Sequence, residues 1–333
     1  MRVCSALPKI TLQRIAHGAA YMRPWLLACL AGMSLAACGS QAPDRARPAP
    51  PTDQAISTLK SAQQLFGAAR LPAALPGPSV IGSYARGCLA RGEALPRDGA
   101  HWQVMRPSRN RYWGHPTLIS FIERLADSAG RTGWRGLLVG DLGQPRGGPA
   151  TSGHASHQIG LDVDIWLTAM PARRYSDAER ETTPAPSMVK FHRRKVQVDR
   201  RLFTASQATL IKEAAESDEV VRVFVNPAIK KALCRSAGRD RAWLGKVRPW
   251  RGHDEHMHVR LRCPDGETMC QQQEPPPDGD GCGAELTSWL KNTDWLPSGG
   301  PEPVPPQISL NALPDACLRV IEAPDVERTA VNP

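Results

Sequence analysis

The sequence predicts an α+β protein, because stretches with helical spacing and stretches with strict alternation follow one another in no regular order. A chain of βαβ units would alternate them regularly, and no internal repeat is visible. Of the 333 residues, 41% are hydrophobic and 22% are charged, so the chain can bury a sizeable core and is not disordered as a whole. After the leader, no uncharged apolar run is long enough to cross a membrane as a helix.

The first expected elements lie between 117 and 166. Apolar residues at helical spacing predict a helix over 117–129, and the apolar run over 136–142 (GLLVGDL) indicates a buried strand. Strict alternation over 160–166 (GLDVDIW) indicates a second strand, with its apolar residues on one face. Asp162 and Asp164 then share the opposite face.

Four further elements are expected towards the C-terminus. Helical spacing predicts a helix over 207–217, and the run VVRVFV over 220–225 indicates a strand. An Asn-Pro pair ends this strand, and the pattern resumes as a helix over 227–234. The segment 256–261 (HMHVRL) alternates again and is predicted to be a strand.

The N-terminus has the pattern of an export signal. A basic segment without acidic residues precedes an apolar run over 25–37, which is too short to span a membrane comfortably. The run ends in Leu-Ala-Ala before Cys38, which resembles a bacterial lipoprotein signal. We therefore expect 1–37 to be a signal peptide and Cys38 to be lipidated. An ordinary signal peptide cleaved before Cys38 is the alternative, and Met22 could be the true start.

The remaining chain is expected to form a tether, one domain and a tail. Cys38 begins a polar, Pro-rich tether over 38–70, the folded domain covers 71–322, and 323–333 is a C-terminal tail. No Asp follows Cys38, which by resemblance to sorted lipoproteins favours the outer membrane. The expected location is therefore the periplasm, with the membrane contacted through the lipid alone.

The cysteine count fits this location. Of the nine cysteines, Cys4, Cys29 and Cys38 fall in the leader or at its end, and six remain. An even number in an oxidising compartment suggests three disulfides and argues against a catalytic thiol. The sequence alone does not choose among the pairings.

The net charge does not by itself demand a nucleic-acid partner. The chain carries a net charge of +10. Four of its basic residues lie in the leader, which contains no acidic residue. The modest excess in the rest of the chain suits an anionic surface or polymer. No basic run is interleaved with aromatic residues, so nucleic acid is not an expected partner.

Two clusters of histidine and aspartate predict a metal site. Because His256 and His258 are two apart on a strand, their rings share a face, and the expected strand 160–166 presents Asp164 in the same way. His157 stands just before that strand, after a Gly-rich loop. The set His157, Asp164 and His258 offers two imidazoles, one carboxylate and an open position. Without a thiolate, this suits a hydrolytic zinc site.

Side chains next to this ligand set are expected to take part in catalysis or to support the ligands. His256 would lie near the attacking water as general base, and His253 could approach from the preceding loop. Asp162 is expected to orient a ligating imidazole, and His154 is either a further ligand or a substrate contact. The other histidines of the domain are expected to be structural or solvated: His101, His115 and His192.

A serine mechanism is a weak alternative. Ser187 and Lys190 have the S-x-x-K spacing of penicillin-binding enzymes. The partner motifs fail, because Ser108-Arg109-Asn110 precedes this pair instead of following it and no Lys-Thr-Gly occurs.

At the level of families, the two clusters resemble the lysostaphin, D-Ala-D-Ala carboxypeptidase and hedgehog type of zinc fold. Longer strings narrow the resemblance, including GHASHQIGLDVDIWL (153–167), QVMRPSRNRYWGHP (103–116) and VFVNPAIKKALC (223–234). With KVRPW, HMHVRLRCP and GDGCGAEL, they are similar to penicillin-insensitive murein endopeptidases of Gram-negative bacteria. The resemblance covers roughly 75–320.

This resemblance implies an α+β domain on a small central antiparallel sheet that carries zinc, flanked by helices and disulfide-pinned loops. It implies hydrolysis of D-alanyl–meso-diaminopimelyl cross-links in peptidoglycan and, in some members, of bonds between two diaminopimelyl residues. It assigns His157, Asp164 and His258 as ligands, with His154 as a further candidate. His256 and His253 match the catalytic histidines.

The resemblance also implies the disulfide pairs Cys88–Cys317, Cys234–Cys282 and Cys263–Cys270. Some members have extra metal ligands between the two clusters, which cannot be placed in the Arg-rich stretch 172–199, so one zinc is expected. Two rivals remain: a zinc D,D-carboxypeptidase or dipeptidase of the same fold, and a non-catalytic, zinc-stabilised wall-binding module. The presence of His256 favours an enzyme.

Overall fold

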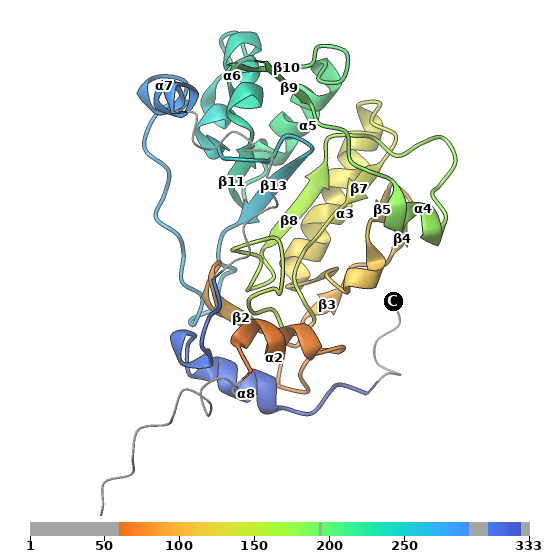
Figure 1. Cartoon of the computed structure of the whole chain (residues 1–333), viewed down its shortest axis with the longest axis vertical. Helices are drawn as coiled ribbons and strands as arrows, with labels where there is room; N and C mark the ends of the chain where they lie inside the picture. The colour runs from red at the N-terminus through yellow and green to blue at the C-terminus, as the bar shows by residue number, and fades with distance from the viewer. Residues whose placement is uncertain (1–59, 193–194, 293–305, 328–333) are drawn as a thin grey trace, which may run out of the picture. The chain divides into compact units, whose positions relative to one another are not determined.

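A seven-stranded mixed sheet organises the part of the chain that the computed structural model describes, namely 60–192, 195–292 and 306–327 (Figure 1). These residues belong to one unit, Thr52–Pro333. In order across the sheet, the strands are β12 (Val247–Pro249), β11 (Val220–Val225), β13 (His256–Leu261), β8 (Asp162–Trp166), β7 (Leu137–Val139), β5 (Trp102–Val104) and β4 (Asp98–Gly99).

The α+β class is confirmed, but the expectation of a small antiparallel sheet is wrong. The middle of the sheet, β11-β13-β8-β7, is antiparallel, whereas β11 pairs with β12 and β5 pairs with β7 in parallel. The added strands β4, β5 and β12 have only two or three residues. Strands this short carry no readable alternation, so their pairing is decided by tertiary packing.

Helices cover one face of this sheet. The expected helices are present as α3 (Pro116–Arg131), α5 (Ala205–Glu216) and α6 (Pro227–Ser236). The apolar side chains of α3 and α5 form one core with the inward-facing residues of β8 and β13, such as Val163 and Val259. Because side chains alternate along a strand, the opposite face of β8 and β13 is left for polar residues.

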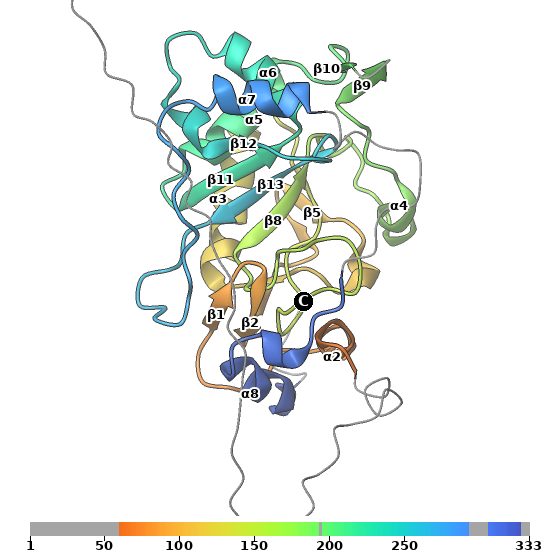
Figure 2. The same ribbon diagram turned by 60° about the vertical axis from the view of Figure 1, so that its left-hand side comes forward.

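Shorter elements surround the sheet. Three two-stranded sheets pair β1 (Ser79–Ser83) with β2 (Arg86–Ala90), β3 (Glu93–Ala94) with β6 (Trp113–Gly114), and β9 (Val189–His192) with β10 (Lys195–Val198). Within the described ranges, the remaining α-helices are α2 (Ala62–Ala68), α4 (Asp177–Thr182), α7 (Ala284–Lys291) and α8 (Ala316–Glu322). In the turned view of Figure 2, α6 and α7 lie at one end of the domain and α2 and α8 at the other.

All three expected disulfides are present. Cys88–Cys317 joins β2 to α8, Cys234–Cys282 joins α6 to the loop before α7, and Cys263–Cys270 closes the loop after β13. The first bond lies in a separate apolar cluster to which α2, β1, β2 and α8 contribute. The C-terminal helix α8 is therefore tied covalently to β2.

The expected signal peptide, 1–37, and the lipidation site Cys38 lie outside the described residues, as does most of the tether. The tether was expected over 38–70, and the last part of that range contains α2. The start of the expected tail is attached to the domain, because Arg146 Nη2 lies 2.8 Å from Asp325 Oδ1. No helix within the described ranges is long and apolar enough to cross a membrane.

Candidate metal centre

The register of β8 and β13 brings the two sequence clusters together. The strands are antiparallel, with His258 opposite Asp164 and Arg260 opposite Asp162. Paired residues on neighbouring strands point to the same face of a sheet. Asp164 and His258 therefore meet on the face opposite the helices, and His258 Nδ1 lies 3.4 Å from Asp164 Oδ1.

His157 reaches the same point from the loop before β8. Its backbone has φ = +67°, a left-handed conformation that costs a non-glycine residue about 1 kcal/mol. Two contacts hold it there: its N–H donates to Asp162 Oδ2 at 3.0 Å, and its ring Nδ1 donates to the Leu142 carbonyl at 2.7 Å. Because a carbonyl only accepts, Nε2 of the neutral ring keeps its lone pair. It lies 3.4 Å from Asp164 Oδ1.

His154 completes a group with metal-binding potential. The candidate ligand atoms of His154, His157 and Asp164 all lie within 4.8 Å of one another. His154 Nε2 is 3.3 Å from Asp164 Oδ2, and the His154 and His157 ring centroids are 4.3 Å apart. With His258, three imidazoles therefore surround one carboxylate.

The donor atoms fit a divalent cation. His157 Nε2 and Asp164 Oδ1 are buried, and among the described residues neither has a hydrogen-bond partner. Burial alone would raise the pKa of Asp164, but His256, His154 and His157 lower it well below its usual range. A buried, ionised and unpaired oxygen beside an unpaired nitrogen is costly unless a cation satisfies both. Nitrogen and oxygen donors without sulfur suit zinc in a hydrolytic site.

Asp162 supports the centre from behind. It is fully buried, and it accepts hydrogen bonds from Arg260 at 2.8 and 3.1 Å. Its Oδ1 lies 3.1 Å from His258 Nε2, whereas Nδ1 of the same ring lies 3.4 Å from Asp164 Oδ1. Burial raises the pKa of Asp162, and the charges of Arg260 and His258 outweigh this and hold it far below its usual range. This is the arrangement expected of a carboxylate that orients a ligating imidazole.

Two residues of the centre were not predicted from the sequence. Arg260 lies between two rings, 4.1 Å from the Tyr84 centroid and 5.3 Å from the Phe224 centroid. Asp141 accepts from Arg111 at 3.0 Å and lies 3.1 Å from His154 Nε2. Burial raises the pKa of Asp141, but His154 and the nearby arginines lower it to about 2. The sequence signal that could have identified Asp141 is the presence of an acidic residue inside the apolar run 136–142.

His256 and His253 lie beside the candidate ligands. His256 Nε2 is 3.7 Å from Asp164 Oδ1 and has no hydrogen-bond partner in the described part of the chain. The His253 ring centroid is 5.0 Å from that of His256 and 5.8 Å from that of His258. Burial, then His256 and His258, lower the pKa of His253 to about 3. Both predicted catalytic histidines are therefore at the centre.

The other predicted residues lie elsewhere. His115 accepts a hydrogen bond from the Thr117 N–H and caps α3, which confirms a structural role. His101 lies near Gly130 of α3. The Ser187 hydroxyl donates to Asp254, and Lys190 Nζ pairs with Asp199 at 2.9 Å, so the serine alternative gains no support.

Comparisons with known proteins identify the family of the chain. A family model described as penicillin-insensitive murein endopeptidase matches residues 80–322. Relatives with that name include one from Haemophilus influenzae, 44% identical over 252 residues, which cover 74% of this chain and 84% of the relative. Another, from Yersinia enterocolitica, is 48% identical over 232 residues, 69% of this chain and 83% of the relative. The chain therefore belongs to the penicillin-insensitive murein endopeptidase family.

Proposed function

We propose that this chain is a zinc-dependent murein endopeptidase that cleaves D-alanyl–meso-diaminopimelyl cross-links of peptidoglycan, and also bonds between two diaminopimelyl residues. The observation that carries the proposal is the convergence of His154, His157 and His258 on the buried carboxylate of Asp164. We further propose that the chain works in the periplasm, attached to the outer membrane by a lipid on Cys38.

His157, Asp164 and His258 would hold one zinc ion, with His154 as a further ligand. Bound there, zinc would polarise the scissile carbonyl and lower the pKa of water. Asp162 and the Leu142 carbonyl would keep the two imidazoles in the tautomers that present a lone pair to it.

His256 is the proposed general base. Its Nε2 is buried beside Asp164 without a hydrogen bond, and burial lowers the pKa of its ring, so it is neutral and can accept the proton of the attacking water. Either His256 or His253, once protonated, can donate to the carbonyl oxygen on which negative charge develops. The proton finally goes to the departing amine. No acyl-enzyme forms, so a β-lactam has no serine to acylate.

The test uses protein lacking residues 1–38, with its disulfides intact, and purified cross-linked muropeptide dimers. With and without a chelator, the products are read by mass spectrometry. Chelator-sensitive conversion of dimers to monomers supports the proposal, and the fragment masses identify the bond. Dimers that persist while terminal alanine is lost would indicate a carboxypeptidase. Zinc binding without any product would indicate a wall-binding module.

A matched pair of variants ties the activity to the site. His258→Ala removes a proposed ligand and should abolish conversion. His101→Ala removes an exposed histidine outside the centre and should leave conversion unchanged. Equal activity in both variants would refute the assignment of the site.

A further inference from the structure

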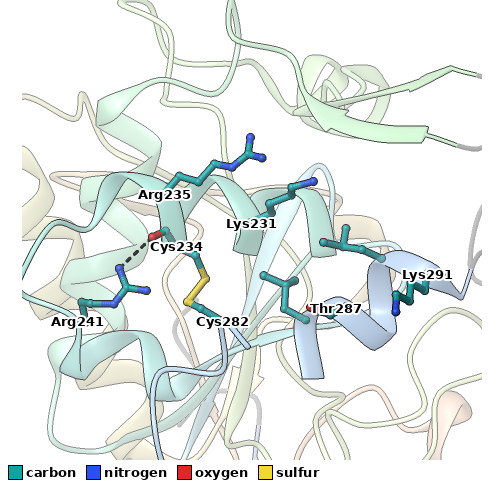
Figure 3. A pocket seen from close by; sticks show the side chains of 9 residues that line it. Lys231, Cys234, Arg235, Arg241, Cys282, Thr287 and Lys291 are labelled. Carbon is teal, nitrogen blue, oxygen red and sulfur yellow. Dashed lines mark hydrogen bonds between the residues drawn. A yellow bond between two sulfur atoms is a disulfide. The ribbon is translucent and has the colours of Figure 1, made fainter. Parts of the chain in front are cut away.

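A cationic cavity lies between α6 and α7, and no residue of the metal centre lines it (Figure 3). Its volume is about 470 Å³. Its wall includes four basic side chains and a disulfide, namely Lys231, Arg235, Arg241, Lys291 and the Cys234–Cys282 bond. Because this bond joins α6 to the segment that leads into α7, the walls are held together covalently.

Most of the positive charge in the cavity is not neutralised. Arg241 pairs with Asp280 at 2.7 Å, and it also donates to the Cys234 carbonyl at 2.9 Å. Within the described ranges, Lys231, Arg235 and Lys291 have no ion-pair partner. Cations gathered around one hollow repel one another, so an anion bound there would be stabilised.

Favourable placement at helix ends does not account for all three cations. Arg235 and Lys291 lie in the last turns of α6 and α7, where positive charge offsets the helix dipole. Lys231 lies in the middle of α6 and gains little from that effect. It shares the cavity with the other two, which points to a ligand.

A row of aromatic rings connects α7 to the metal centre. Trp289 of α7 lies 5.8 Å from Trp250, Trp250 lies 5.7 Å from Phe224, and Phe224 lies 5.2 Å from His258, measured between ring centroids. Three ring contacts therefore separate the helix that lines the cavity from a candidate metal ligand. The helix that lines the cavity therefore belongs to the same side-chain network as the metal centre, although Trp289 itself does not line the cavity.

We infer that this cavity docks carboxylates of peptidoglycan stem peptides adjacent to the cross-link being cleaved. The inference rests on the proposed function, because that function makes the substrate a polymer with carboxylates on each stem peptide. A weak second attachment raises the effective concentration of such a substrate at the catalytic site. Charge complementarity favours a carboxylate-rich strand over the neutral parts of the wall.

The test compares two triple variants of equal charge in the full chain. One carries Lys231→Gln, Arg235→Gln and Lys291→Gln in the cavity. The matched control carries Arg86→Gln, Arg131→Gln and Arg135→Gln, three exposed arginines that do not line it. Binding to insoluble sacculi is measured by sedimentation on ice at low and high salt. Thermal melting checks that both variants fold.

We expect the cavity variant to bind sacculi roughly 3- to 30-fold more weakly at low salt, with a smaller difference at high salt. The control should bind like wild type. The ratio of kcat/KM on sacculi to that on soluble dimers should fall only in the cavity variant. Esterifying the sacculus carboxylates should remove the difference between the variants.

Equal binding by the two triple variants would overturn the inference, as would a cavity effect that persists on esterified sacculi. These outcomes are separable from failure of the proposed function. That failure appears as unconverted soluble dimers with wild-type protein, whatever the sacculus binding shows.

Discussion

The metal centre and the α6–α7 cavity both gather charged side chains, but they do so in opposite ways. At the centre, Asp164 and His258 are each 4% exposed and are placed by the register of two strands. In the cavity, Lys231 is partly exposed and Arg235 is exposed, and both extend from one helix. Losing a buried polar contact is costly, whereas an exposed charge contributes little and is screened by salt. The comparison indicates that the proposed chemistry is fixed by buried strands and the loops beside them, whereas the proposed attachment is distributed over helices.

Neutralising the shared carboxylate should have the largest effect. Asp164→Asn keeps the shape but removes the charge on which His154, His157 and His258 converge, so zinc content and dimer hydrolysis should both fall below detection. Elemental analysis measures the zinc content, and mass spectrometry measures the hydrolysis of dimers. Asp199→Asn, at a buried carboxylate outside the centre, should keep both. Normal zinc content in Asp164→Asn would refute the site.

Removing the proposed base should separate catalysis from metal binding. His256→Gln should lower kcat by about 10²- to 10⁴-fold while zinc content stays at the wild-type level. Steady-state kinetics on soluble dimers, with elemental analysis of the same sample, test this. A variant that retains activity while His258→Ala loses it would show that His256 is not the base.

Opening the cavity disulfide should affect attachment and stability more than chemistry. Cys234→Ser with Cys282→Ser breaks a link between residues 48 apart and should cost about 4 kcal/mol in unfolding free energy. The matched pair Cys263→Ser and Cys270→Ser, only 7 apart, should cost about 2.5 kcal/mol. Urea unfolding compares them. Sacculus binding should weaken in the first pair, and an unchanged affinity would show that the bond does not shape the cavity.

Changing the supporting carboxylate should weaken the metal site without emptying it. Asp162→Asn should bind zinc roughly 10- to 100-fold less tightly, because His258 loses the carboxylate charge that lies 3.1 Å from its Nε2. Competition with a chromogenic chelator measures this affinity. Asp98→Asn, whose partner is Arg180 near the sheet edge, is the control. If both variants bind zinc equally, Asp162 is structural only.

The smallest expected effect concerns two adjacent lysines of α6. Burial and the charge of Arg248 lower the pKa of Lys230 from 10.5 to about 7. Between these pH values the unfolded chain holds the extra proton, so stability rises with pH, by at most about 1.4 kcal/mol per unit. Lys230→Met should remove this rise, and Lys231→Met should keep it. Urea unfolding at pH 7 and pH 9 measures the unfolding free energy of both variants. An identical pH dependence of this free energy in the two variants would contradict the burial argument.

Long patterns in the sequence predicted their elements well. The bounds expected for β11 and β13 are those observed, because each strand has six residues with a clear apolar run or alternation. The sheet was underestimated because β4 and β12 are too short to show any pattern. The disulfide pairs followed from family resemblance, since spacing alone leaves the pairings open.

The site was predictable where its geometry is local. His256 and His258 share a face by strand periodicity, and the adjacent strand supplies Asp164. Arg260 lies on the same strand face as His258 and alternation could have placed it there, but an arginine is not a metal-ligand type. Asp141 was missed because its contact with His154 depends on how an intervening loop folds. Pairings of this kind depend on tertiary structure.

The Cys88–Cys317 bond has a consequence for biogenesis. Its partners are 229 residues apart, and both other disulfides lie between them in the sequence. In the exported protein that we propose, Cys88 would emerge from the translocation channel long before Cys317, and would meet Cys234 first. Wrong bonds formed at that stage require thiol–disulfide exchange to correct. Maturation of the enzyme should therefore depend on a disulfide-isomerising activity outside the cytoplasm, and an unfinished chain would hold a reactive thiol where the wall is built.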